Sequence, residues 1–290
     1  MSNIRPIEHV FAPPAPHMVG DGFRVHNFFP GQIPKTRMSP FFLLDYNSKI
    51  DFSPSKEPRG VGVHPHRGFE TVTIAYHGKV AHHDSAGNSG VIGEGDVQWM
   101  TAASGLLHKE YHEKEFSARG GLFQMVQLWV NLPAKDKMGK PKYQEIPNGK
   151  MGRHVLDASG SFMEVIAGNY KGTAGPAFTF TPMEVYNARL TKGGKADLSF
   201  PAHYNTAFLV VEGEVIVNGK PVTTDHFILF KNEGTEIILE ATSNAIVLVL
   251  SGEPINEPIA NYGPFVMNTW EELEQAVKDV NAGLFGVLED

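Results

Sequence analysis

Gly62-Val-His64-Pro-His66-Arg-Gly-Phe-Glu70 places two histidines two positions apart in the first third of the chain. In an extended strand successive side chains point to opposite faces, so residues two positions apart share a face. A second stretch, Gly105-Leu-Leu-His108-Lys-Glu110, repeats this spacing with a histidine and a glutamate. Both pairs can therefore converge on one metal ion.

The strong metal ligands that this chain offers are histidine, aspartate and glutamate. The chain has no cysteine, which excludes disulfides, thiolate nucleophiles and cysteine-ligated zinc. Three imidazoles and a carboxylate suit Fe(II), Mn(II), Ni(II), Co(II), Cu(II) or Zn(II), so the ligand types do not choose among these metals. Such a set leaves positions open on a six-coordinate ion, which is typical of a reactive site rather than a structural one.

The carboxylate ligand is open between Glu110 and Glu70. Glu110 lies two positions after His108 and shares its face in a strand, which favours it as the fourth ligand. Glu70 then becomes a candidate second-shell group that orients a ligand imidazole.

Composition argues against several classes of partner. The formal net charge of -7 and the pI near 6.0 argue against direct nucleic-acid binding, because phosphate contacts need clustered lysine and arginine. The N-terminus lacks the apolar core of a signal peptide, and no apolar run is long enough to span a membrane. We therefore expect a cytoplasmic protein without a membrane partner. A protein partner cannot be read from the sequence.

Short segments rich in β-branched and aromatic residues predict an all-β fold. Thr71–Tyr76, Gln124–Val130 and Ala245–Leu250 are examples, and glycine or Asn-Gly separates many such segments. A β-sandwich or β-barrel is the expected class. One helix is predicted near the C-terminus, where Thr269 and Glu272 form a capping-box pattern.

The two halves of the chain resemble each other. Ile74–Val80 and Leu209–Val215 each read as strand, glycine turn, strand. Extending this overlay places residues that are not good metal ligands at the positions of the first-half donors: Ser199, Pro201, Ile237 and Leu239. The second half is therefore expected to hold no metal.

The sequence predicts three segments: residues 1–133 as a metal-binding barrel, 134–152 as a linker, and 153–290 as a second barrel with the C-terminal helix. The linker is rich in lysine, proline and glycine, and its lysines, such as Lys137, are expected to be solvated.

Polar neighbours favour surface positions for His82, His83 and His112. Trp129 is expected in the core rather than at a substrate site.

The spacing Gly-x-His-x-His-x3-Glu, followed by Gly-x2-His, resembles the motifs of the cupin superfamily. Within it, the chain resembles the pirin family through five strings: His64–Thr71, Asp96–Ala102, Gly105–Glu110, Gln127–Leu132 and Gly263–Thr269. This resemblance covers nearly the whole chain. It implies a bicupin of two stacked β-barrels, in which the first holds a non-haem Fe(II) and the second holds no metal. Pirins take their carboxylate ligand from the position that is Glu110 here.

The resemblance also implies an activity. Proteins of this family resemble quercetin 2,3-dioxygenases, which open the central ring of a flavonol with O2 and release carbon monoxide. On this hypothesis His64, His66, His108 and Glu110 hold Fe(II), and Glu110 also accepts the 3-hydroxyl proton. Two alternatives remain open. One is a metal-bound regulatory protein, such as a transcriptional co-regulator or a modulator of a metabolic enzyme, and the other is an oxygenase or isomerase for a different small molecule.

Overall fold

The computed structural model describes residues 3–289. Strands hold 52% of the chain and helices 8%, which confirms the all-β prediction. The chain forms two compact units, and each contains a seven-stranded and a four-stranded antiparallel sheet. The two sheets of each unit form the double-sheet arrangement of a jelly roll.

The first unit comprises Ala15–Gln32, Phe41–Asn148 and the chain from Ile255 onward. Its seven-stranded sheet has the spatial order β12 (Lys142–Ile146), β9 (Val97–Thr101), β6 (Phe69–His77), β11 (Gly121–Asn131), β4 (Phe41–Phe52), β3 (Phe23–Phe29) and β2 (His17–Val19). Its four-stranded sheet has the order β5 (Gly60–His66), β10 (Leu106–His112), β7 (Val80–Asp84) and β8 (Ser89–Ile92). The remaining elements are a hairpin, two helices and a 3-10 turn: β25 (Ala260–Tyr262), β26 (Phe265–Met267), α1 (Lys114–Arg119), α2 (Trp270–Asn281) and η1 (Ala134–Asp136).

The second unit comprises the N-terminal stretch up to Pro14, Ile33–Pro40 and Gly149–Pro254. Its seven-stranded sheet has the order β1 (Ile7–Phe11), β22 (Phe227–Phe230), β19 (Asn205–Glu212), β24 (Ala245–Gly252), β17 (Met183–Leu190), β14 (Phe162–Ala167) and β13 (Gly152–Val155). Its four-stranded sheet has the order β18 (Lys195–Ser199), β23 (Glu236–Ala241), β20 (Glu214–Val217) and β21 (Lys220–Thr223), and a small hairpin joins β15 (Asn169–Tyr170) to β16 (Thr173–Ala174).

The strand orders of the two units match position by position. In the seven-stranded sheets β6 corresponds to β19 and β11 to β24, and in the four-stranded sheets β5 corresponds to β18 and β10 to β23. The internal repeat that the sequence suggests is therefore also present in the topology.

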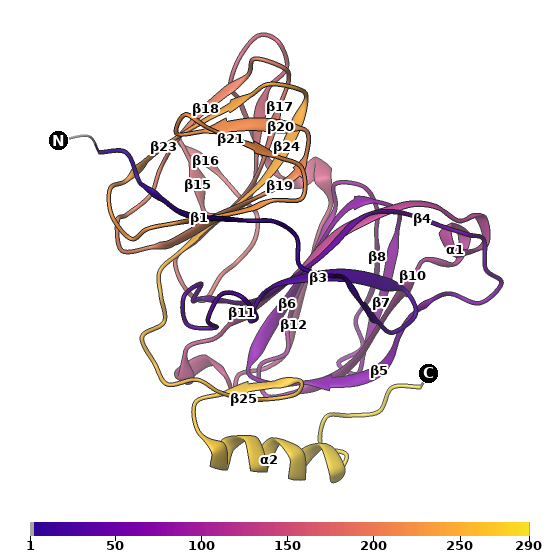
Figure 1. The fold of residues 1–290 in the computed structure, drawn as a ribbon. Coiled ribbons are helices and arrows are strands. Elements are labelled where there is room, and N and C mark those ends of the chain that lie inside the picture. The colour runs from indigo at the N-terminus through magenta and orange to yellow at the C-terminus, as the bar shows by residue number, and fades with distance from the viewer. Residues whose placement is uncertain (1–2, 290) are drawn as a thin grey trace. The chain divides into compact units, whose positions relative to one another are not determined.

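The unit boundaries differ from those expected from the sequence. β1 pairs with β22, so the N-terminal segment belongs to the second unit. The chain from Ile255 onward, including α2, belongs to the first unit, and β12, from the expected linker, pairs with β9. Figure 1 shows by colour that each terminal segment joins the unit formed mainly by the other half of the chain. The indigo strand β1 lies among orange strands, and the yellow C-terminal segment lies beside purple strands. A sheet edge offers unpaired backbone groups to any segment, however distant in sequence, so a linear division of the chain misses such pairings.

Apolar side chains fill the interior of the second unit. Ile237 and Leu239 on β23 are fully buried in its core, at the strand that corresponds to β10. On β18 the sequence overlay is wrong by one residue. It places Ser199 at the position of His64, but Ser199 is exposed, whereas Leu198 is buried and pairs with Ile237 as His64 pairs with His108.

The helix α2 begins after Thr269, whose side chain and that of Glu272 complete the predicted capping box. Its buried residues Leu273 and Ala276 pack in a cluster with Phe265 and Met267 of the hairpin. Within residues 3–289, neither helix is long and apolar enough to cross a membrane.

Lys137 is buried rather than solvated, contrary to the sequence expectation. Its Nζ donates to the carbonyl oxygen of Gly68 at 2.7 Å, to that of Val266 at 2.8 Å and to Asn131 Oδ1 at 2.6 Å. Burial lowers the pKa of Lys137 to about 7. This single side chain ties the hairpin of β25 and β26 to the turn between β5 and β6.

The close approach of Gly68 to Val266 can be tested with two matched glycines. Gly68 and Gly87 both have a φ of +88°, but a Cβ on Gly68 would lie 2.0 Å from the Val266 carbonyl oxygen, whereas nothing lies within 4 Å of one on Gly87. Gly87→Ala should lower the free energy of unfolding by about 1 kcal/mol, the cost of a left-handed backbone. Gly68→Ala should lower it by about 2–4 kcal/mol, since the hairpin must also move. Thermal melts measure which variant is less stable. Equal decreases in melting temperature for Gly68→Ala and Gly87→Ala would contradict the close contact between Gly68 and Val266.

Candidate metal centre

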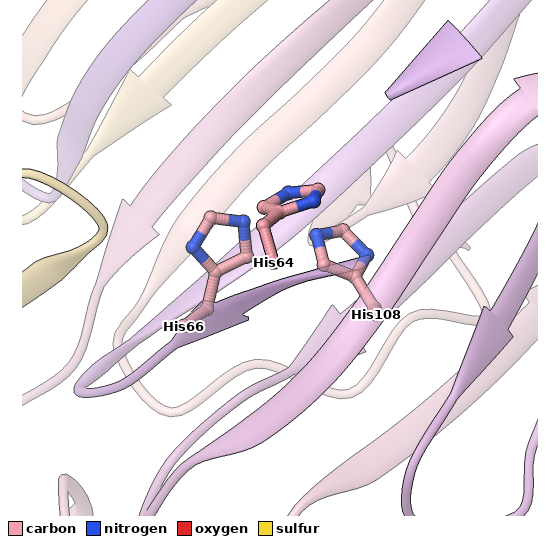
Figure 2. Close-up of side chains that lie close together, drawn as sticks. All are labelled: His64, His66 and His108. Carbon is pink, nitrogen blue, oxygen red and sulfur yellow. The ribbon is translucent and has the colours of Figure 1, made fainter. Parts of the chain in front are cut away.

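Pairing between β5 and β10 brings the three histidines together. His64 lies directly opposite His108, and His66 lies opposite the neighbouring Leu106. The ring centroids are 4.2 Å apart for His64 and His108, 4.6 Å for His66 and His108, and 4.8 Å for His64 and His66. Figure 2 shows the three imidazoles gathered at one point. One nitrogen from each lies within 4.8 Å of the others, so the three rings form a group that could hold one metal ion.

Hydrogen bonds to carbonyl oxygens orient two of these rings. His64 Nδ1 lies 2.8 Å from the Gly62 carbonyl oxygen, and His66 Nδ1 lies 3.3 Å from that of Pro264. Because a carbonyl oxygen only accepts, each Nδ1 carries a hydrogen, and in the neutral form of the ring Nε2 then keeps its lone pair. The C-terminal hairpin thus supplies, through Pro264, the group that sets the tautomer of His66.

His108 is oriented by a buried relay on the neighbouring strand β7. His82 Nε2 lies 3.3 Å from Asp84 Oδ2, and His82 Nδ1 lies 3.4 Å from His108 Nδ1. Burial would raise the pKa of Asp84, but hydrogen bonds from His82 and Asn88 outweigh it and lower that pKa. The ionised carboxylate keeps the proton on His82 Nε2, so His82 Nδ1 accepts from His108 Nδ1. His108 Nε2 is left buried without a hydrogen-bond partner.

The electrostatics of the cluster favour neutral imidazoles. Burial lowers the pKa of His66 and of His108 well below the usual value, and neighbouring imidazoles lower both further. Metal ligation requires the neutral ring. Two neutral rings at His66 and His108, with an unpartnered buried nitrogen on His108, therefore fit a divalent metal ion.

Glu110 joins the cluster from the same strand as His108. One carboxylate oxygen lies within 4.8 Å of nitrogens on His108 and His82. Its Oε1 accepts hydrogen bonds from Gln98 Nε2 at 2.6 Å and Thr73 Oγ1 at 3.1 Å, and its Oε2 accepts one from Gln127 Nε2 at 2.6 Å. Because each carboxylate oxygen offers two lone pairs, Oε2 retains one that could bind an ion.

The donors to Glu110 belong to a polar row that crosses the seven-stranded sheet. Directly paired residues run across β9, β6, β11, β4 and β3 in the order Gln98, Thr73, Gln127, Asp45 and Asn27. Directly opposed residues in antiparallel strands point to the same face. The row therefore faces the histidine-bearing sheet as one continuous polar strip.

A cavity of about 300 Å³ opens beside this cluster. Its polar lining consists of three of the four metal-ligand candidates and two residues of the polar row: His64, His66, Glu110, Gln127 and Asp45. Its apolar lining consists of Val19, Phe23, Val25, Val61, Met125, Trp129 and Pro264. A cavity lined by both polar and apolar side chains fits a small amphipathic molecule.

Glu70 is buried with a different set of neighbours. It pairs with Thr101 across β6 and β9, and its Oε1 accepts a hydrogen bond from Thr101 Oγ1 at 2.7 Å. Strand alternation turns Glu70 away from the face that carries Thr73. No imidazole is among its hydrogen-bond partners within residues 3–289, so its expected role in orienting a ligand imidazole has no contact to support it. Burial raises the pKa of Glu70 to about 7.

Several residues near the site were misjudged from the sequence. His82 and His112 are fully buried rather than at the surface, and His112 Nε2 bonds the Gly22 carbonyl oxygen at 2.8 Å. Trp129 lines the cavity, with its ring centroid 5.2 Å from that of His66. The spacing of His82 and Asp84, two positions apart like the ligand pairs, is the signal that could have identified the relay.

The relay predicts a loss of metal affinity when His82 is replaced. His82→Phe keeps a ring that can stack on Tyr143 but removes the acceptor for His108 Nδ1. Affinity for a divalent metal should fall about 10- to 100-fold, as is usual when a group that orients a ligand is lost. His83→Phe, on the adjacent and partly exposed position, is the control. Competition with a chelator measures both, and equal affinities would rule out the relay.

The pKa of Glu70 predicts a pH-dependent stability. With a folded pKa of about 7 and an ordinary unfolded value near 4.5, the carboxyl group holds its proton more tightly in the folded state. The folded protein therefore loses stability as the pH rises from about 4.5 through 7. Glu70→Gln, which stays neutral, should melt several degrees above the wild type at pH 8 and close to it at pH 5. An increase in melting temperature that is the same at pH 5 and pH 8 would contradict the raised pKa of Glu70.

Comparison with known proteins agrees with this geometry. The family model described as Pirin matches residues 22–130, and the model described as Pirin C-terminal cupin domain matches residues 185–286. A Pseudomonas aeruginosa protein named as a candidate quercetin 2,3-dioxygenase is 47% identical over 269 residues, covering 93% of this chain and 94% of that protein. A pirin-like protein of Solanum lycopersicum is 36% identical, covering 92% of this chain and 88% of that protein.

A solved structure extends the agreement to three dimensions. The crystal structure of a quercetin 2,3-dioxygenase from Acinetobacter baumannii superposes with a TM-score of 0.93 at 47% sequence identity, covering 99% of this chain and all of that one. The matches span both units and include every residue of the histidine cluster. The chain therefore belongs to the pirin family.

Proposed function

We propose that this protein is a metal-dependent dioxygenase that opens the ring of flavonols such as quercetin with O2, and that its metal is Fe(II). The observation that carries the proposal is the cluster of three histidines beside a cavity lined by both polar and apolar side chains. The relatives named for quercetin 2,3-dioxygenase activity support the choice of substrate.

Different residues would bind the metal ion and the substrate. His64, His66 and His108 would hold the ion, with Glu110 as the fourth ligand through the free lone pair of Oε2. A ferrous ion bound there would supply Lewis acidity and a source of electrons for dioxygen chemistry. The apolar side chains of the cavity lining, including Phe23 and Met125, would bind the aromatic rings of the substrate and exclude water.

The polar row would keep this ligand set in place. Gln98, Thr73 and Gln127 hold Glu110 in one orientation, and the relay through His82 holds His108. Such preorganisation limits the movement needed when substrate enters.

The test of the function uses protein purified without oxygen and loaded with Fe(II). Addition of quercetin and O2 should consume flavonol, measured by its absorbance, with release of carbon monoxide. Metal content is measured by elemental analysis of the same sample. A metal-loaded protein that consumes no oxygen with any flavonol would overturn the proposal and favour a metal-bound regulatory protein.

The carboxylate assignment is tested separately with a matched pair of variants. Glu110→Gln should lower metal affinity at least 10-fold, because an amide is a weaker ligand and its NH2 group faces the donors that now bond the carboxylate. Glu70→Gln should keep the wild-type metal content. Metal retained in the first variant and lost in the second would reverse the assignment.

A further inference from the structure

Glu110 has no lone pair to spare for a proton. Among residues 3–289 its carboxylate accepts three hydrogen bonds, from Gln98, Thr73 and Gln127. A carboxylate offers four lone pairs in total, so the fourth is used once Glu110 binds the ion. A proton acceptor for the substrate must therefore lie elsewhere in the cavity.

Asp45 is the second carboxylate in the cavity wall. It lies directly opposite Gln127 in the pairing of β4 with β11, one position further along the polar row. Within the described chain, Asn27 is its single hydrogen-bond donor, to Oδ1 at 2.8 Å. Its Oδ2 is left with both lone pairs available to a bound molecule.

The surroundings of Asp45 suit a base. Burial raises the pKa of its carboxyl group, opposed by the Asn27 hydrogen bond and by the nearby charge of His17. His64, His66 and Glu110 line the same cavity and are the other titratable groups there. A carboxylate whose pKa is moved towards neutrality is a more effective proton acceptor at physiological pH than an ordinary one.

We propose that Asp45, rather than Glu110, is the catalytic residue that accepts the hydroxyl proton of the substrate. The inference rests on the proposed function. The O–H bond of the flavonol 3-hydroxyl breaks, its electron pair stays on the oxygen, and the proton passes to Asp45 Oδ2. The products of this step are a flavonolate and a neutral carboxylic acid, so charge and atoms balance without a further reactant.

The different roles proposed for Glu110 and Asp45 follow from their positions relative to the polar row. Gln127 separates the two carboxylates, donating to Glu110 on one side and facing Asp45 on the other. One carboxylate is thus saturated with donors and suited to hold an ion, while its neighbour is left with a single donor and suited to exchange a proton.

The experiment compares wild type, Asp45→Asn, Asp45→Glu and the control Asp51→Asn, all loaded with Fe(II). Asp51 is exposed on the same strand β4. Quercetin is first added without oxygen, and ionisation is followed by the red shift of its absorption. The wild type and Asp51→Asn should ionise the flavonol at neutral pH, and Asp45→Asn should bind it in the neutral form with an unchanged metal content.

Turnover is then measured across pH. Asp45→Asn should reduce kcat about 10²- to 10⁴-fold, the usual range for loss of a general base. Its remaining rate should rise with pH as the flavonol ionises in solution, and Asp45→Glu should recover part of the loss. Melting temperatures confirm that the variants are folded.

Three outcomes would overturn the inference. The first is an Asp45→Asn variant that ionises quercetin and turns over like the wild type. The second is an Asp45→Asn variant that loses its metal together with its activity, which would indicate a structural role. A wild-type protein that binds no flavonol would overturn the proposed function as well, so the two failures are distinguishable.

Discussion

The antiparallel pairing of β5 with β10 is the constraint on which the candidate metal centre depends. It sets His64 opposite His108 and, through β7, brings His82 and Asp84 onto the same inner face. Because side chains alternate along a strand, a shift of one residue in this register would turn the imidazoles outward. The C-terminal hairpin reinforces the register, since Pro264 bonds His66 and Lys137 joins Gly68 to Val266.

The two units show how one topology carries two different interiors. Their strand orders match throughout, yet β10 bears His108 and Glu110 where the corresponding β23 bears buried Ile237 and Leu239. Apolar side chains can be buried without hydrogen-bond partners, whereas burying a carboxylate or an imidazole is unfavourable unless it is hydrogen-bonded. The polar row of Gln98, Thr73 and Gln127 supplies those partners to Glu110. The candidate metal centre thus depends on two facing sheets and not only on the strands that carry the histidines.

Much of the fold and the clustering of the three histidines could be predicted because their signals are local. The two-residue spacing of His64 and His66 and the capping box at Thr269 each depend on residues within one element. Predictions based on neighbouring polarity failed at Lys137 and His82, because a polar side chain is buried whenever distant segments supply its hydrogen bonds. The exchange of terminal segments between the units has the same origin in edge-strand pairing.

By itself the sequence determined the all-β class, the internal repeat and the histidine pairs, since periodicity and turn chemistry act over a few residues. Only the tertiary structure decided how the two carboxylates of the cavity differ. Glu110 and Asp45 lie on different sheets, and the number of donors that each meets depends on which residues stand opposite one another across five strands. Cross-strand register between segments far apart in sequence has no local signature, so the difference in hydrogen bonding between Glu110 and Asp45 becomes visible only in the folded chain.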